Sequence, residues 1–192
     1  MFFLREKPDV SSLPAPLQRV ALMLRTYGWI ALGLQLVLGV VSMGILLSGI
    51  LGRAFGPTED KAGVGFGIFL AICGLVTLGI GIYIAFRYTR ISKQLVAATA
   101  ANRPSKSDTL QTIRLGLIVN LVGMLLTIFG AQAIIGSIVI RSISQPTGLT
   151  VYDANRFVRP LDLFLVQANI NTITAHFVGI AIAIWLFNRI NR

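Results

Sequence analysis

Residues 27–51 read YGWIALGLQLVLGVVSMGILLSGIL, a run of 25 positions without a charged side chain. An α-helix rises about 1.5 Å per residue, so about 20 such residues cross the roughly 30 Å hydrocarbon core of a bilayer. A helix also pairs its backbone amides within one segment, which lipid requires because it offers no water to bond them. The run therefore predicts a membrane-spanning helix.

Three further apolar stretches have the same character, at residues 64–86, 115–140 and 163–187. Only 12% of the chain is charged, against about 25% in a typical soluble domain. We therefore predict an all-α fold, an integral membrane four-helix bundle, with residues 27–192 as the four-span transmembrane domain.

Residues 1–26 are predicted to form an N-terminal segment with a short amphipathic helix over LPAPLQRVALMLR, residues 13–25. Such a helix lies on the membrane surface, and a plain continuation of the first span is the alternative. The opening MFFLREKPDVSSLPAP is typical of neither a signal peptide nor a transit peptide, which favours a bacterial or organelle-encoded origin. Farther along, Asp108 with Gln111 predicts a capping box that starts the third helix.

The net charge of +10 comes from cations in short segments beside the apolar runs. Twelve of the 17 cations fall on one predicted side of the membrane and five on the other. The positive-inside rule therefore puts both termini in the cytoplasm or the stroma. Cations in these places meet lipid headgroups, and they form no extended basic face for nucleic acid.

Glycines are frequent in the spans, and Gly116, Gly123 and Gly130 follow one another at seven-residue intervals. Small residues on one face let helices approach closely in a membrane, so we expect tight packing within a bundle or an oligomer. A gate or hinge is the alternative.

The fourth span contains QANINTITAH, residues 167–176, with polar side chains on two sides of the helix. At 100° per residue, Asn169, Thr172 and His176 share one face, and Gln167, Asn171 and Thr174 lie nearly opposite. Lipid tolerates neither face uncovered. We therefore expect the chain to form an oligomer or to line an aqueous vestibule.

His176, the sole histidine, is either a metal ligand or proton relay or a hydrogen-bonding side chain between helices. Its expected partners are Gln35, Asn120 and Gln132. No Asp or Glu lies within a span, so one chain offers a poor site for a hard cation. The sequence contains no triad or HExxH motif, and Cys73 is its only cysteine. We therefore expect neither an enzyme nor a bound cofactor.

Trp29-Ile30, QLVLGVVS at residues 35–42, and the segments from Gln167 and from Ala175 to Gly179 resemble the "permease in chloroplasts" family. This family is also assigned as a small subunit of the chloroplast inner-envelope translocon. The resemblance implies a four-span protein of the chloroplast inner envelope or of a cyanobacterial plasma or thylakoid membrane. It implies two roles, iron permease and component of a protein-import translocon.

Two functional hypotheses follow, and a lipid- or pigment-binding subunit is a third possibility that rests only on the apolar surface. The first is an oligomeric transport protein for metal ions, with iron as the candidate substrate and a path between subunits lined by His176, Asn169 and Thr172. The second is a non-catalytic scaffold or subunit of a membrane complex for protein translocation or photosynthetic assembly. Gln35 and Asn171 complete the set of polar candidates for such a path.

Overall fold

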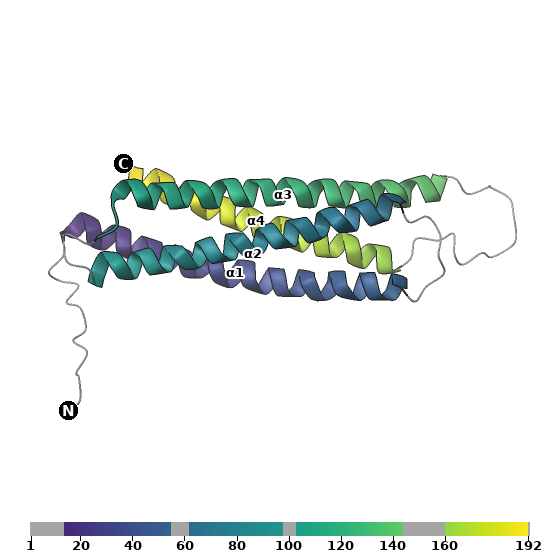
Figure 1. Ribbon diagram of the computed structural model, residues 1–192, viewed down its shortest axis with the longest axis horizontal. Coiled ribbons are helices and arrows are strands. Elements are labelled where there is room, and N and C mark those ends of the chain that lie inside the picture. Colours follow the sequence, from purple (N-terminus) through teal and green to yellow (C-terminus); the bar gives the residue numbers. More distant parts are fainter. Residues whose placement is uncertain (1–13, 55–61, 98–102, 144–159, 192) are drawn as a thin grey trace, which may run out of the picture.

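The computed structural model describes residues 14–54, 62–97, 103–143 and 160–191. These residues form four helices that lie side by side along the long axis of the molecule (Figure 1). They are α1 (Ala15–Ala54), α2 (Ala62–Ala97), α3 (Lys106–Ile143) and α4 (Pro160–Asn191). Each predicted span lies within one of these helices, and the predicted all-α four-helix bundle is confirmed.

The helices form a closed square. α1 packs against α2 and α4, and α3 packs against the same two helices from the opposite corner. Contact between α2 and α4 is much smaller, as expected for a diagonal pair. The start of α1 and the end of α4 lie at the same end of the molecule (Figure 1). This is the up-down-up-down arrangement of an antiparallel bundle.

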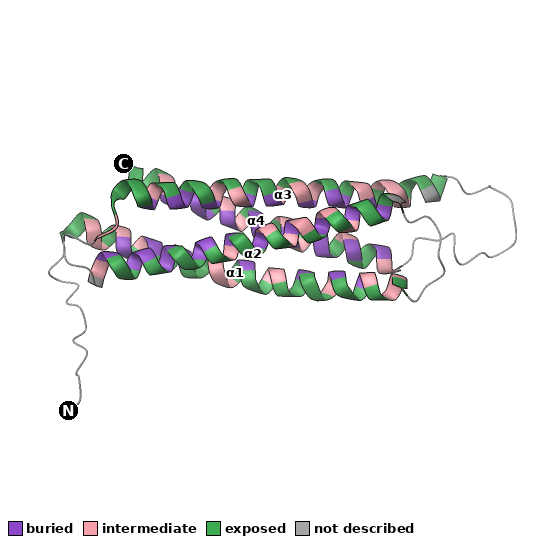
Figure 2. Ribbon diagram, in the orientation of Figure 1, coloured by how far each residue is buried: buried purple, intermediate pink, exposed green. Residues whose placement is uncertain are grey.

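The core follows a seven-residue repeat in the helices. On α1 the buried residues at this interval are Ala21, Gly28, Gln35, Ser42 and Gly49. On α2 they are Val64, Ala71, Leu78, Ala85 and Ser92. A second buried set lies three or four positions away, which gives each helix one narrow inward seam (Figure 2). Such a repeat keeps the same stripe against neighbouring helices over many turns.

The outside of the bundle is apolar along most of its length. Large side chains such as Trp29, Phe66, Phe129 and Phe177 are half or more exposed. All four helices are long and apolar enough to cross a bilayer. Exposed apolar surface of this extent requires lipid around it, and the chain is an integral membrane protein.

Two local predictions need correction. The segment from Ala15 is helical, but it runs into the first span without a break, so the separate surface helix is wrong and the continuation holds. Residues 1–13 lie outside the described part of the chain. The cap of α3 is Ser105, whose hydroxyl accepts a 3.0 Å bond from the Asp108 amide. The predicted capping box is therefore wrong by three residues, because the cap is Ser105 and not Asp108.

Candidate functional site

Three polar side chains, one each from α1, α3 and α4, meet at the centre of the bundle. Gln35 of α1 donates through Nε2 to Asn120 Oδ1 of α3, 2.8 Å away, and lies 3.2 Å from the Ala175 carbonyl of α4. His176 of α4 lies with Nδ1 3.1 Å from the same Asn120 oxygen. Asn120 in turn donates to the Gly116 carbonyl at 2.8 Å. We call Gln35, Asn120 and His176 the central cluster.

Glycines make the room that the central cluster occupies. A Cβ built on Gly123 would meet the His176 ring and the Thr77 hydroxyl. One on Gly179 would meet the Gln35 amide, and one on Gly81 would lie 2.9 Å from Asn120 Oδ1. The polar side chains of the central cluster occupy the space where any residue other than glycine would have its Cβ atom. The amides and the imidazole can therefore contact one another directly.

Both ring nitrogens of His176 face oxygen atoms. Nδ1 lies near Asn120 Oδ1, and Nε2 lies 3.2 Å from the Gly74 carbonyl of α2. A neutral imidazole carries one N–H and donates to one of these oxygens at a time, whereas an imidazolium donates to both. The ring is fully buried, so these contacts join three helices without water access from the surface.

A second polar layer lies one heptad closer to the beginning of α4. The Ser42 hydroxyl of α1 donates to the Ala168 carbonyl at 3.0 Å. Thr172 bonds the same carbonyl at 2.9 Å, and the Asn169 amide nitrogen bonds the Leu165 carbonyl at 2.9 Å. Two buried oxygens in these layers, Gln35 Oε1 and Asn169 Oδ1, have no hydrogen-bond donor within the described structure.

An ion pair closes the bundle at the beginning of α4. The Arg53 guanidinium, near the end of α1, lies 2.6 Å from the Asp162 carboxylate. Asp162 is fully buried and Arg53 is 16% exposed. The carboxylate also sits in the first turn of α4, where the helix dipole favours a negative charge.

The opposite face of α4 presents amides at the surface. Gln167 and Thr174 are exposed and Asn171 is half-buried. Gln167 Nε2 donates to Asn171 Oδ1 at 3.1 Å, and Thr174 bonds the Ile170 carbonyl of its own helix. Asn171 lies eight residues, or about 12 Å, inside the predicted span, so this polar surface is at the depth of lipid chains.

A depression of about 260 Å³ lies between α1 and α4. Gly44 and Ser48 line it on the α1 side and Phe164 lines it on the α4 side. A Cβ on Gly44 would meet nothing within 4 Å. We call Gly44, Ser48, Gln167, Asn171 and Thr174 the outer α1–α4 face.

The predicted site residues therefore separate into two groups. Asn169, Thr172 and His176 are at most 2% exposed, and Gln35 is 1% exposed. They are packed inside one bundle, so they do not line the surface where copies would meet, and that part of the predicted path is wrong. Asn171 lies apart from them on the outer α1–α4 face.

The predicted partners of His176 are partly right. Asn120 contacts the ring directly and Gln35 joins it through Asn120, whereas Gln132 is exposed. The sequence reasoning missed Ser42 and the Gly74 carbonyl. A signal for the inward seam is present in the sequence. Gln35 and Ser42 are seven residues apart, and so are Asn169 and His176.

Among the described residues, no group of three or more His, Cys, Asp or Glu side chains comes together to hold a metal ion. The oxygens and nitrogens around His176 belong to amides and backbone carbonyls. These groups are neutral, and hard divalent cations prefer anionic oxygen ligands. The central cluster is therefore better suited to joining helices than to retaining such an ion.

Comparison with known proteins fits a membrane bundle of this kind. A family model described as "Protein of unknown function (DUF3611)" matches residues 14–191, which include all four helices. The chain belongs to this family. It is also 25% identical over 192 residues to "Protein TIC 21, chloroplastic" of Arabidopsis thaliana, which agrees with the resemblance found in the sequence.

That match covers 96% of this chain and 62% of the Arabidopsis protein, so the chain spans less than two thirds of its relative's length. No solved structure matches the chain with significance. The comparisons therefore support a membrane protein of the DUF3611 family related to a chloroplast protein.

Proposed function

We propose that the chain is a non-catalytic subunit of a membrane complex and that copies of it associate laterally through the outer α1–α4 face. One observation carries this proposal: amide groups of Gln167 and Asn171 lie on the surface of the bundle at the depth of lipid chains. An unpaired polar group in hydrocarbon costs several kcal/mol. A neighbouring protein removes that cost by supplying hydrogen-bond partners.

The chemistry of the face favours a second copy as the neighbour. An amide contains both a donor and an acceptor, so the same two amides on a two-fold-related copy pair with these without any other residue type. Gly44 and Ser48 are four residues apart on α1 and provide the small-residue surface on which membrane helices pack closely. Small residues of α1 and amides of α4 are thus both on the surface of the bundle.

Cysteine cross-linking tests this arrangement. Cys73, the only cysteine, is replaced by alanine, and Asn171→Cys is introduced into the full-length protein in its native membrane. We expect a covalent dimer with a short bismaleimide. The matched control is Gly79→Cys on α2, where a Cβ meets nothing within 4 Å and which lies outside the outer face.

Cross-linking at both positions alike would indicate random collision and contradict the proposal. A product in which position 171 joins only to a different protein would contradict self-association.

A metal-ion permease, with iron as substrate, is the second candidate. Two buried oxygens favour it, Gln35 Oε1 and Asn169 Oδ1, because both lack a donor and carbonyl oxygens bind hard cations. Purified protein in liposomes would then pass iron, and Asn169→Ala with His176→Ala would lower the flux. Thr174→Ala is the control, and flux equal in the double variant and the control would remove this path.

The membrane orientation belongs to the same proposal. Cations near the start of α1, the end of α2 and the start of α3 support an orientation with that end of the bundle in the cytoplasm or the stroma. The membranes that the family resemblance implies are a cyanobacterial plasma or thylakoid membrane or a plastid inner envelope. Protease protection of tags at either end of the chain tests the orientation.

A further inference from the structure

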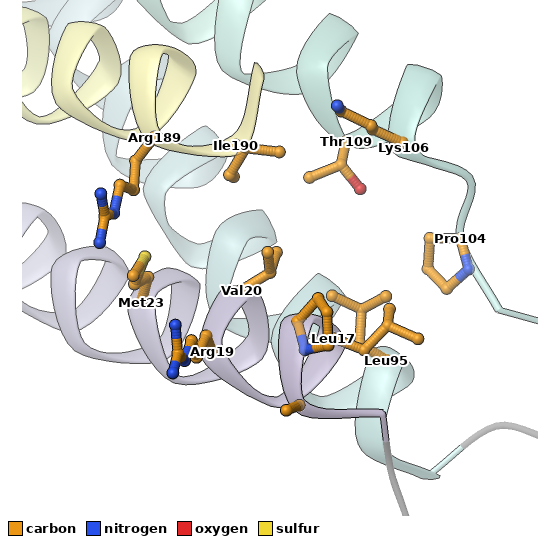
Figure 3. A pocket seen from close by; sticks show the side chains of 12 residues that line it. Leu17, Arg19, Val20, Met23, Leu95, Pro104, Lys106, Thr109, Arg189 and Ile190 are labelled. Carbon is orange, nitrogen blue, oxygen red and sulfur yellow. The ribbon is translucent and has the colours of Figure 1, made fainter. Parts of the chain in front are cut away.

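A cavity of about 690 Å³ lies at the end of the bundle where α1 and α3 begin and α4 ends. Side chains of all four helices line it, and Figure 3 shows them from close by. Its volume falls within the roughly 300–1,000 Å³ range of small-molecule sites. The cavity is separate from both polar faces of α4, so the roles discussed for those faces do not explain it.

Three cationic side chains from three helices surround the cavity. They are Arg19 of α1, Lys106 of α3 and Arg189 of α4, and no carboxylate is among the described residues that line it. In Figure 3, Arg19 and Arg189 lie on one side of the cavity and Lys106 lies across from them. The Lys106 ammonium also lies 3.4 Å from the Asn191 carbonyl. The concentration of positive charge favours an anion.

The rest of the cavity lining is mostly apolar, and we call Val20 and Met23 of α1 and Ile190 of α4 its floor. Contact with these apolar side chains does not stabilise a free, strongly hydrated anion. Apolar side chains are stabilised when they leave water for contact with other apolar groups. An anion attached to a hydrocarbon chain matches both the cations and the floor.

The level of the cavity along the helices agrees with such a ligand. Arg189 follows the apolar stretch 163–187 by two residues, and Met23 precedes the stretch 27–51 by four. This is where the hydrocarbon layer gives way to headgroups. Basic pockets between membrane helices at this level bind acidic headgroups.

We propose that this cavity binds an acidic lipid from the adjacent leaflet. The headgroup phosphate or sulfate lies among Arg19, Lys106 and Arg189, and the beginning of the acyl chains lies on Val20, Met23 and Ile190. This site is independent of the lateral assembly proposed above, because the two surfaces share no residue.

A binding titration on the full-length protein in neutral detergent tests the site. The probe is short-chain phosphatidylglycerol, with short-chain phosphatidylcholine as the neutral comparison. We expect the acidic lipid to bind at least about tenfold more tightly, because its charge faces three cations. Replacing Arg19, Lys106 and Arg189 together by Gln should weaken binding by about 100-fold, since each cation contributes about fivefold.

The matched control removes three charges from the same end of the bundle but outside the cavity, by Arg87→Gln, Lys93→Gln and Arg114→Gln. All three side chains are exposed. We expect lipid affinity to change by less than about twofold. A loss equal to that of the cavity variant would show general surface attraction and overturn the site.

A second variant separates the lipid from a free anion. Val20→Trp fills the floor and leaves every charge in place, so it should lower phosphatidylglycerol binding by about tenfold. Inorganic phosphate is titrated in parallel. Phosphate binding as tight as that of the lipid, or lipid binding untouched by Val20→Trp, would overturn the proposal. Circular dichroism on each variant checks that the helices are retained.

Discussion

Asn169, Thr172 and His176 on one side of α4 are at most 2% exposed, whereas Gln167 and Thr174 on the opposite side are exposed. The residue types are alike: amides, a threonine on each side and one imidazole. Their surroundings differ completely. The inner side is enclosed by α1, α2 and α3, whereas on the outer side Gln167 and Thr174 are exposed and Asn171 is only half-buried.

The hydrogen bonds differ in the same way. His176 contacts oxygens on α2 and α3, and Asn120 receives the Gln35 amide from α1. On the outer side, Gln167 bonds Asn171 and Thr174 bonds Ile170, all within α4. Interhelical bonds account for the inner polar groups as part of the fold. The outer groups have no comparable role in one chain, and for this reason we assign them to assembly.

The largest expected effect concerns the glycines behind the inner side. Gly123→Leu would place a branched side chain where the His176 ring and the Thr77 hydroxyl lie. Helices α3 and α4 would have to separate, at a cost of about 3 kcal/mol or more in the free energy of unfolding. Denaturant titration in detergent micelles, followed by circular dichroism, measures the loss.

The matched variant is Gly79→Leu on α2, where a Cβ would meet nothing within 4 Å. It has the same change in volume on a helix of the same bundle. We expect stability to stay within about 0.5 kcal/mol of the unchanged protein. Similar losses in both variants would mean that the added side-chain volume at any position of the bundle, and not the packing around His176, governs the result.

Much of this division was accessible from the sequence. Charge-free stretches predicted the four helices, because lipid excludes charge regardless of the tertiary contacts. A rotation of 100° per residue correctly separated the two polar sides of α4. Asn120 was among the expected partners of His176 because amides in the spans are few.

The sequence did not reveal which face of each helix points toward the core. Helical periodicity gives the angle between two faces of a helix, but not which face meets the neighbouring helices. Asn169 and His176 were therefore placed between copies, although they share the seven-residue register of the buried Asp162 and Ala183. Reading that register in all four helices at once identifies the inward seam. By the same criterion Gln132 falls outside the α3 seam that holds Asn120, Thr127 and Ile134.

The smallest expected effect on folding comes from the outer side itself. Gln167→Leu with Asn171→Leu removes side-chain amides that, among the described residues, bond each other. In dilute detergent we expect the free energy of unfolding to change by less than about 0.5 kcal/mol. His176→Leu, which removes bonds to two other helices, is expected to cost about 1–2 kcal/mol under the same conditions.

In lipid, the outer double variant is expected to have the larger effect, and that effect is on association. If copies stabilise one another through the outer α1–α4 face, the melting temperature of the unchanged protein rises with the protein-to-lipid ratio, because association favours the folded state. The outer double variant should melt at one temperature at every ratio, while His176→Leu should melt lower but keep the dependence. A ratio dependence that survives in the double variant would mean that the amides face something other than a second copy. The two sides of α4 would then differ in burial alone.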